Sequence, residues 1–298
     1  MLARRAHQRT QPQPMEKTMQ PSSLVVALGD RRYCVERPWG ELPPGPVTDV
    51  TVDSRGHVFV LLRWDPLADT TSPRVIELHP DGRQLAAWGS SLIADGHMLA
   101  AAPDDRLYIV DRDAHEIVVC RGNGERVGGL GKRNAPLEPF NHPTDVAIAP
   151  SGEIYVSDGY AGHRVHRFTP DWKLIQSWGE LGDGPGQFLT PHAIWVMRDG
   201  RVIVADRENN RLQLFTSDGT YLVSWTGFFK PMDIWGDERD NIYVTDQVPT
   251  LSCFAADGRL IGRSRPVLNG AHGLWGDTRG NLYLAEINPS RITRLSPL

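Results

Sequence analysis

The sequence predicts an all-β fold, a six-bladed β-propeller with four antiparallel strands in each blade. One pattern recurs about every 40 to 48 residues, which is the period of propeller blades. No helical period of 3.6 residues is sustained anywhere, and Gly, Pro and Asp turns interrupt the chain about every ten residues. These observations together exclude an α/β fold.

Each of the six copies is a short apolar strand, a polar turn with Asp, Gly or Asn, and a second alternating strand, which is typical of a β-hairpin. The copies read TDVTVDSRGHVFVLL from Thr48, HMLAAAPDDRLYIVD from His97, TDVAIAPSGEIYVSD from Thr144, HAIWVMRDGRVIVAD from His192, MDIWGDERDNIYVTD from Met232 and HGLWGDTRGNLYLAE from His272. A third strand, a turn and a fourth strand follow most copies, as in RVHRFTPDWKLIQSWG from Arg164. Each unit is therefore a four-stranded sheet.

We expect one propeller domain over residues 23–298. A single sheet leaves both faces in water, so the six units must stack radially and bury their apolar faces against each other. Residues 23–36 precede the first blade and are expected to supply the outermost strand of the last one, which removes an exposed sheet edge. Residues 1–22 are rich in Arg, Gln and Pro, and we expect a disordered tail. Met15 and Met19 are also candidate start positions.

Composition excludes several classes of partner. The formal net charge is -4 and the basic residues are scattered, so we expect no nucleic acid partner. No apolar run approaches the ~18 residues that span a bilayer, and we expect no membrane partner. Cys34, Cys120 and Cys253 are odd in number and far apart, which is a poor disulfide framework. Because the cysteines do not form a disulfide framework, we expect a cytoplasmic protein. The sequence does not indicate its oligomeric state.

Histidine recurs at one position of the repeat. Aligning the copies superimposes their first residues, and histidine occupies that place in the second, fourth and sixth blades, as His97, His192 and His272. Alternate blades of a six-fold ring are related by about 120°, so the three side chains should converge on the axis. The alternative is that these are three unrelated histidines among ten, each satisfied locally. Their joint placement favours a metal site.

Three neutral imidazoles with the remaining positions open are typical of catalytic zinc. We therefore predict one Zn²⁺ on His97, His192 and His272. Ligand softness does not exclude Fe²⁺, Co²⁺ or Mn²⁺.

A second register lies fifteen residues after the shared position. It holds Arg63, Arg112, Gly159, Arg207, Gln247 and Ile287, and Tyr160 follows directly. Arginines at the mouth of the channel would bind an anionic substrate group. The alternative for each arginine is a surface ion pair. The preceding carboxylates occur in five of the six blades, which indicates an architectural role; they are Asp111, Asp158, Asp206, Asp246 and Glu286.

Several segments resemble the peptidyl-α-hydroxyglycine α-amidating lyases and their bacterial relatives. They are NHPTDVAIAPSGEIYVSDGYAGHRV (141–165), PHAIWVMRDGRVIVADRENNRLQLF (191–215) and AHGL (271–274). The segment WGELGDGPGQFLTPH (178–192) is similar to the glycine-rich linker of NHL-repeat propellers. The resemblance covers nearly the whole chain from about residue 40.

The resemblance implies a set of roles. In that family a six-bladed propeller carries zinc on three histidines, which match His97, His192 and His272 here. The catalytic tyrosine of the family matches Tyr160, and its active-site arginines match Arg63 and Arg207. By that likeness zinc would polarise a hemiaminal hydroxyl or a carbonyl oxygen as a Lewis acid. Tyr160 would accept the proton as general base.

The chain also departs from that family. Gly273 stands where the lyase has an aspartate that helps to hold a structural calcium ion, so the sequence does not support the calcium site. Ala161 replaces a cysteine of the secreted lyase, and its disulfide is absent. Residues 269–271 differ from the Met-Pro step of the lyase, which changes the pocket wall.

We therefore expect a metal-dependent lyase or hydrolase that cleaves a C–N bond in a small carboxylate- or amide-bearing substrate. One alternative is a non-catalytic NHL propeller that acts as a protein-interaction scaffold. Another is a calcium-dependent lactonase or gluconolactonase-like propeller, which needs Glu, Asn and Asp ligands in the channel. The shared position supplies His, Thr and Met instead. Fold alone does not identify the substrate.

Overall fold

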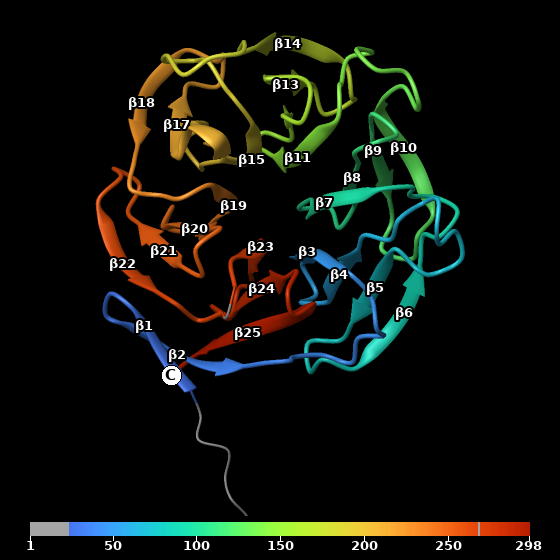
Figure 1. Ribbon diagram of the computed structural model, residues 1–298, viewed down its shortest axis with the longest axis vertical. Coiled ribbons are helices and arrows are strands. Elements are labelled where there is room, and N and C mark those ends of the chain that lie inside the picture. Colours follow the sequence, from blue (N-terminus) through green and yellow to red (C-terminus); the bar gives the residue numbers. More distant parts are fainter. Residues whose placement is uncertain (1–23, 268) are drawn as a thin grey trace, which may run out of the picture.

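The computed structural model describes residues 24–267 and 269–298, and the expected disordered tail of residues 1–22 lies outside the described residues. Within that part the fold is the expected six-bladed propeller, six antiparallel sheets arranged as a ring (Figure 1). Apart from a 3-10 turn at Arg207–Asn209, the regular elements of the described chain are all strands.

In the first five blades the strands follow chain order from the innermost to the outermost. Blade one is β3 (Val47–Val52), β4 (Val58–Leu62), β5 (Val75–Leu78) and β6 (Gln84–Trp88). Blade two is β7 (Gly96–Ala101), β8 (Leu107–Asp111), β9 (Glu116–Cys120) and β10 (Arg126–Gly131). Blade three is β11 (Pro143–Ile148), β12 (Ile154–Asp158), β13 (Arg164–Phe168) and β14 (Leu174–Trp178).

Blade four is β15 (Pro191–Val196), β16 (Val202–Asp206), β17 (Arg211–Phe215) and β18 (Tyr221–Trp225). Blade five is β19 (Pro231–Gly236), β20 (Ile242–Asp246), β21 (Leu251–Phe254) and β22 (Leu260–Ser264). Blade six is β23 (Ala271–Gly276), β24 (Leu282–Glu286) and β25 (Arg291–Pro297), joined by β2 (Arg31–Glu36) and β1 (Leu24–Leu28).

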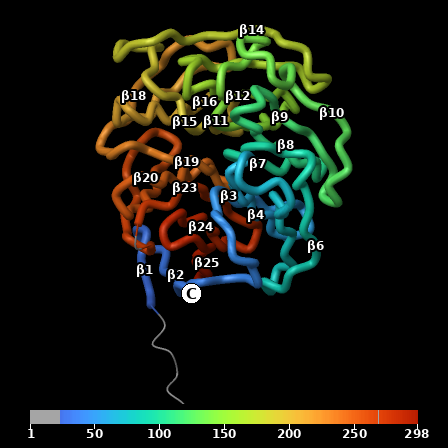
Figure 2. Tube along the Cα trace, turned by 45° about the vertical axis from the view of Figure 1, so that its right-hand side comes forward, coloured from blue at the N-terminus to red at the C-terminus, as the bar shows by residue number. Residues whose placement is uncertain are grey.

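The sixth blade joins the two ends of the described chain. Strand β2 pairs with β25, with Val35 opposite Leu295, and both lie together in Figures 1 and 2. The segment supplies two strands rather than one, because β1 pairs in turn with β2 across a two-residue turn at Gly29 and Asp30. Gly29 has a φ of 61°, which suits such a hairpin turn. The backbone hydrogen bonds between β2 and β25 therefore close the ring of blades without a covalent link.

The core lies between the blades. All six residues of β3 are buried, and so are all five of β4, whereas the outermost strand β6 is largely exposed. Val60 of blade one packs in one apolar cluster with Tyr283 and Ala285 of blade six. Burial of these faces is the main force that holds neighbouring blades together.

A β-bulge stands at the start of the innermost strand in every blade. The register shifts lie between Val47 and Asp49, Gly96 and Leu99, Pro143 and Asp145, Pro191 and Ala193, Pro231 and Asp233, and Ala271 and Gly273. The shared position of the repeat falls within each bulge. Because a bulge redirects side chains relative to the regular alternation of a strand, it can aim this position at the axis.

The repeated carboxylates are architectural, as the sequence indicated. Asp111 accepts hydrogen bonds from the backbone N–H groups of Ala94 and Asp95, which lead into the innermost strand of the same blade. Asp158 and Asp206 accept equivalent bonds in blades three and four. These contacts fix how the chain enters the innermost strands of these three blades.

We predict that Ser296→Cys forms a disulfide with Cys34, because the two residues are direct partners in the β2–β25 ladder. Side chains of such pairs lie within reach of a disulfide. The oxidised variant should be more stable by about 2–4 kcal/mol in thermal or denaturant unfolding, and the gain should vanish with reductant. The matched control is Ser296→Cys with Cys34→Ser. No cross-link under oxidising conditions would contradict the closure.

Candidate metal centre

The three predicted histidine ligands lie together on the propeller axis. His97, His192 and His272 each offer one ring nitrogen, and these atoms all lie within 4.8 Å of one another. Their ring centroids are 4.9 to 5.1 Å apart. The side chains are buried, with at most 4% exposed. Residues separated by 175 positions in the sequence thus form one cluster.

Each imidazole is oriented by the following blade. The Nδ1 atom lies 2.6 Å from the carbonyl oxygen of Thr144 for His97, 2.7 Å from that of Met232 for His192, and 3.0 Å from that of Thr48 for His272. A carbonyl only accepts, so Nδ1 carries the proton and donates it. The lone pair of each Nε2 atom is then free to bind a metal.

The protonation state also suits a metal. Burial lowers the pKa of all three imidazoles, that of His272 to about 4, and the neighbouring imidazoles lower the pKa of His97 further. Neutral imidazole is the form that coordinates metals. Three neutral nitrogen donors fit the donor set of a catalytic zinc site.

Tyr160 points at the same cluster. Its hydroxyl lies 3.0 Å from Nε2 of His97 and 3.2 Å from Nε2 of His192. Gly159 allows this approach, because a Cβ atom there would lie only 2.1 Å from the carbonyl oxygen of Pro191. The Ser-Asp-Gly-Tyr step of the sequence therefore places a phenol within reach of whatever the histidines hold.

Arginines flank the phenol. Nη1 of Arg207 donates to the Tyr160 hydroxyl at 3.2 Å, and its guanidinium carbon lies 5.3 Å from the ring centroid. The guanidinium carbon of Arg112 lies 5.2 Å from the same centroid. Both distances are within the range of cation–π attraction. Tyr160 is thus in contact with two guanidinium groups.

Arg63 makes an ion pair, the alternative that the sequence left open. Its Nε and Nη2 atoms donate to Asp95 at 2.7 and 3.2 Å. Nε of Arg112 lies 2.8 Å from the same carboxylate. Asp95 is only 4% exposed and serves as an anchor for both arginines.

Sequence reasoning missed Asp95 and the contact of Arg112 with Tyr160. The available signal was position, because Asp95 stands two residues before a predicted ligand and Arg112 shares the register of Arg63 and Arg207. The repeat pattern did not indicate that the Asp95 carboxylate would pair with Arg63 of blade one and Arg112 of blade two.

A second ring, of aspartates, was also missed. In the odd blades the residue after the shared position is Asp49, Asp145 or Asp233, and each Oδ2 atom accepts a backbone N–H from the next blade, at 2.8, 2.8 and 2.6 Å. The even blades use histidine Nδ1 for the same purpose. Six hydrogen bonds from a side chain to the backbone of the next blade therefore surround the axis, and carboxylates alternate with imidazoles. We call these six hydrogen bonds the side-chain clips. The channel holds aspartates as well as His, Thr and Met.

The NHL repeat is the family pattern that the chain matches, over residues 140–168 and 188–215. These segments correspond to blades three and four, from which Tyr160, His192 and Arg207 come. The fold and the site thus define an NHL-repeat propeller with a histidine-lined axis.

The chain has several curated relatives. It is 30% identical over 213 residues to peptidyl-glycine alpha-amidating monooxygenase of Mus musculus, covering 62% of this chain and 22% of that protein. It is 30% identical over 227 residues to NHL repeat-containing protein 3 of Mus musculus, covering 71% and 60%. It is 26% identical over 248 residues to peptidyl-alpha-hydroxyglycine alpha-amidating lyase 1 of Drosophila melanogaster, covering 70% and 45%.

These matches confirm the resemblance that the motifs indicated: the chain carries NHL repeats and is related to the peptidyl-α-hydroxyglycine α-amidating lyases. It spans about a fifth of the first of these relatives and less than two thirds of the others.

Solved structures share the fold at low identity. A gluconolactonase from Xanthomonas campestris aligns with a TM-score of 0.66 and 17% identity, covering 91% of each chain. Virginiamycin B lyase from Staphylococcus aureus aligns with a TM-score of 0.63 and 15% identity, covering 89% of this chain and 88% of that one. In the described part of the chain we find no helix whose length and apolar character would let it cross a membrane.

We predict that the aspartate ring makes stability depend on pH. Burial raises the pKa of Asp145 to about 7, so the folded chain keeps a proton that the unfolded chain loses near pH 4. The contribution of the protonated Asp145 to the free energy of unfolding is complete below about pH 4 and is lost as the pH rises through 7. Asp145→Asn keeps the acceptor for Ile194 but cannot ionise, so its stability should fall less over this range.

The test is urea unfolding of metal-free protein at several pH values, in buffers without amines. The difference between wild type and Asp145→Asn should change by a few kcal/mol between about pH 4 and 8. The histidines are common to both proteins, and their own pH dependence cancels. Parallel profiles would show that Asp145 ionises normally.

Proposed function

We propose that this chain is a zinc-dependent lyase or hydrolase that cleaves a C–N bond in a small carboxylate- or amide-bearing substrate. The observation that carries the proposal is the position of the Tyr160 hydroxyl within hydrogen-bond distance of the Nε2 atoms of His97 and His192. A metal-binding face and a proton acceptor thus meet at one point. The names of the relatives suggest an α-hydroxyglycine-type substrate.

His97, His192 and His272 would hold the zinc ion, which would supply a Lewis acid for a substrate oxygen. Tyr160 serves as general base and accepts the proton of the substrate hydroxyl. Arg207 positions the Tyr160 oxygen through its hydrogen bond at 3.2 Å.

The reaction of such a substrate balances without a further reagent. As Tyr160 takes the hydroxyl proton, the carbon–oxygen double bond forms and the carbon–nitrogen bond breaks. The departing nitrogen takes up a proton, which yields a primary amide, and an α-hydroxyglycine unit leaves as glyoxylate. The phenol returns the proton overall, and no oxidant is consumed.

The arginines supply the binding of an anionic group. Arg63, Arg112 and Arg207 surround the mouth on the Tyr160 side, and their side chains are partly exposed. Asp95 fixes two of them, so their positions are set before a substrate arrives. A planar guanidinium suits a carboxylate. Arg63 and Arg207 are therefore assigned to substrate binding beside the reacting centre.

We predict that His192→Ala loses the metal while the propeller stays folded. Two imidazoles remain, and removing one of three ligands should reduce bound zinc from about one per chain to a small fraction. Elemental analysis of protein purified without added metal measures this, with circular dichroism for the fold. His79→Ala is the matched control, because that side chain is 41% exposed and lies outside the cluster. Equal zinc in both variants would contradict the site.

We predict that Tyr160→Phe lowers kcat by about 100-fold or more, because a general base typically contributes a factor of that size. Its zinc content should match that of the wild type, since the phenol is not among the three ligands. The assay follows glyoxylate release from an N-acyl-α-hydroxyglycine. Tyr221→Phe, which removes a surface hydroxyl bonded to Ser224, is the control. An unchanged kcat in Tyr160→Phe would remove this residue from the mechanism.

A further inference from the structure

A cavity of about 290 Å³ opens along the axis at the end opposite Tyr160. Tyr160 follows β12, whose last residue Asp158 pairs with Pro143 at the start of β11. The cavity is lined instead by the far ends of the innermost strands, such as Ala147 and Ile148 of β11. It is therefore separate from the mouth that the proposed reaction uses.

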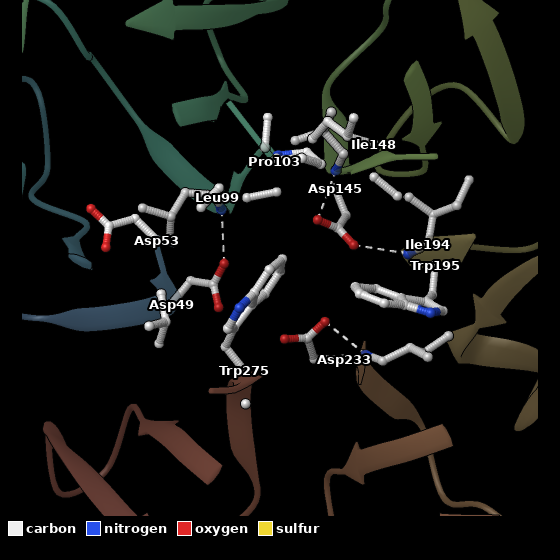
Figure 3. Close-up of a pocket in the computed structure, with 18 of the residues that line it drawn as sticks. Asp49, Asp53, Leu99, Pro103, Asp145, Ile148, Ile194, Trp195, Asp233 and Trp275 are labelled. Atoms are coloured by element: carbon white, nitrogen blue, oxygen red, sulfur yellow. Dashed lines mark hydrogen bonds between the residues drawn. The ribbon is translucent and has the colours of Figure 1, made fainter. Parts of the chain in front are cut away.

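The carboxylates of Asp49, Asp145 and Asp233 form the polar centre of this cavity. Figure 3 shows them pointing toward one another from three alternate blades. They are 3%, 6% and 6% exposed. Each Oδ2 accepts a backbone N–H from the next blade. Oδ1 of Asp145 and of Asp233 also accepts a backbone N–H, from Val146 and Ile234, whereas Oδ1 of Asp49 is buried without any hydrogen-bond partner. A buried acceptor of this kind calls for a donor.

The cavity lacks positive charge. Its described lining contains no Lys, Arg or His. Two further lining carboxylates, Asp53 and Asp277, are each paired with an arginine that lies outside the lining. Burial and mutual repulsion raise the pKa of Asp49 and Asp233 well above the ordinary range. A bound cation would favour the ionised form of these carboxyl groups, and the described residues that line the cavity supply none.

The walls are apolar and aromatic. Ala100, Ile194 and Ile234 line the cavity, and the rings of Trp195 and Trp275 lie beside the carboxylates, 5.8 Å apart between centroids (Figure 3). Tryptophan faces attract cations, and apolar walls accept an alkyl chain. The lining therefore combines a group of carboxyl side chains with apolar and aromatic walls.

We propose that this cavity is a second ligand site, which binds a primary ammonium group carried on a short alkyl chain. The ammonium head has three N–H donors, and Oδ1 of Asp49 offers it an unpaired acceptor. The carboxyl oxygens of Asp145 and Asp233, which line the same cavity, each keep a second lone pair beside the backbone N–H they accept. Charge-assisted hydrogen bonds of this type are the strong ones.

A directly bound metal ion fits the ring less well. Among the described residues, the three ligating side chains whose ligand atoms all lie within 4.8 Å of one another are the histidines. Calcium takes about six to eight oxygen ligands at about 2.3–2.6 Å, whereas one oxygen of the ring, Oδ1 of Asp49, is without a hydrogen-bond partner. An ammonium head needs fewer acceptors, one for each of its three N–H groups.

The test is calorimetric titration of the zinc-replete wild type with n-butylammonium chloride, in an amine-free buffer. 1-Butanol is the neutral analogue, and calcium chloride tests the metal alternative. Binding of the ammonium with quenching or shift of tryptophan fluorescence, and at least about tenfold weaker binding of the alcohol, is the expected result. This comparison requires no variant.

Asp49→Asn locates the site, because it keeps an acceptor for Leu99 while removing the charge. It should weaken butylammonium binding by at least about tenfold. Asp199→Asn, on an exposed turn outside this cavity, should bind as the wild type does. Equal affinity in Asp49→Asn, equal affinity for the alcohol, calcium binding in place of the ammonium, or no binding would each overturn the proposal. None of these results bears on zinc or on the proposed reaction.

Discussion

The structure depends on one constraint at the axis: six innermost strands must be held at fixed distances around a ring that has no covalent closure. Apolar stacking between blades supplies most of the stabilisation but is not directional. Direction comes from the six side-chain clips. Aspartate carboxylates in the odd blades accept from the next backbone, and histidine Nδ1 atoms in the even blades donate to it. A bulge in every innermost strand presents these side chains to the axis.

The same clips prepare the candidate metal centre. Because each Nδ1 proton is used between blades, the three Nε2 lone pairs face one another, and burial keeps the rings neutral. Structural and chemical roles therefore coincide in the same imidazoles. Tyr160 joins them only because Gly159 lets the chain pass close to Pro191. The arginines are fixed by Asp95 and by the phenol itself.

The repeat length, the turn residues and the alternating strands were sufficient to predict the propeller and its four strands per blade. They also indicated one shared position for His97, His192 and His272, because residues that align between repeats occupy equivalent places in their blades. The pattern could not reveal the bulge, since a bulge changes pairing and not residue type. For that reason the aspartates one residue later were not expected to reach the axis. The sequence predicted one strand over residues 23–36 and did not reveal the two-residue turn at Gly29 and Asp30 that separates β1 from β2. Asp95 lies outside the repeat and had no counterpart to compare.

The most direct test of the account is a crystal structure of the purified protein with anomalous scattering recorded on both sides of the zinc edge. We predict one peak on the axis, about 2.0–2.1 Å from Nε2 of each of His97, His192 and His272, with Tyr160 facing it. A metal-replete crystal with no peak at these nitrogens, or with the imidazoles bonded to the chain through Nε2, would contradict it.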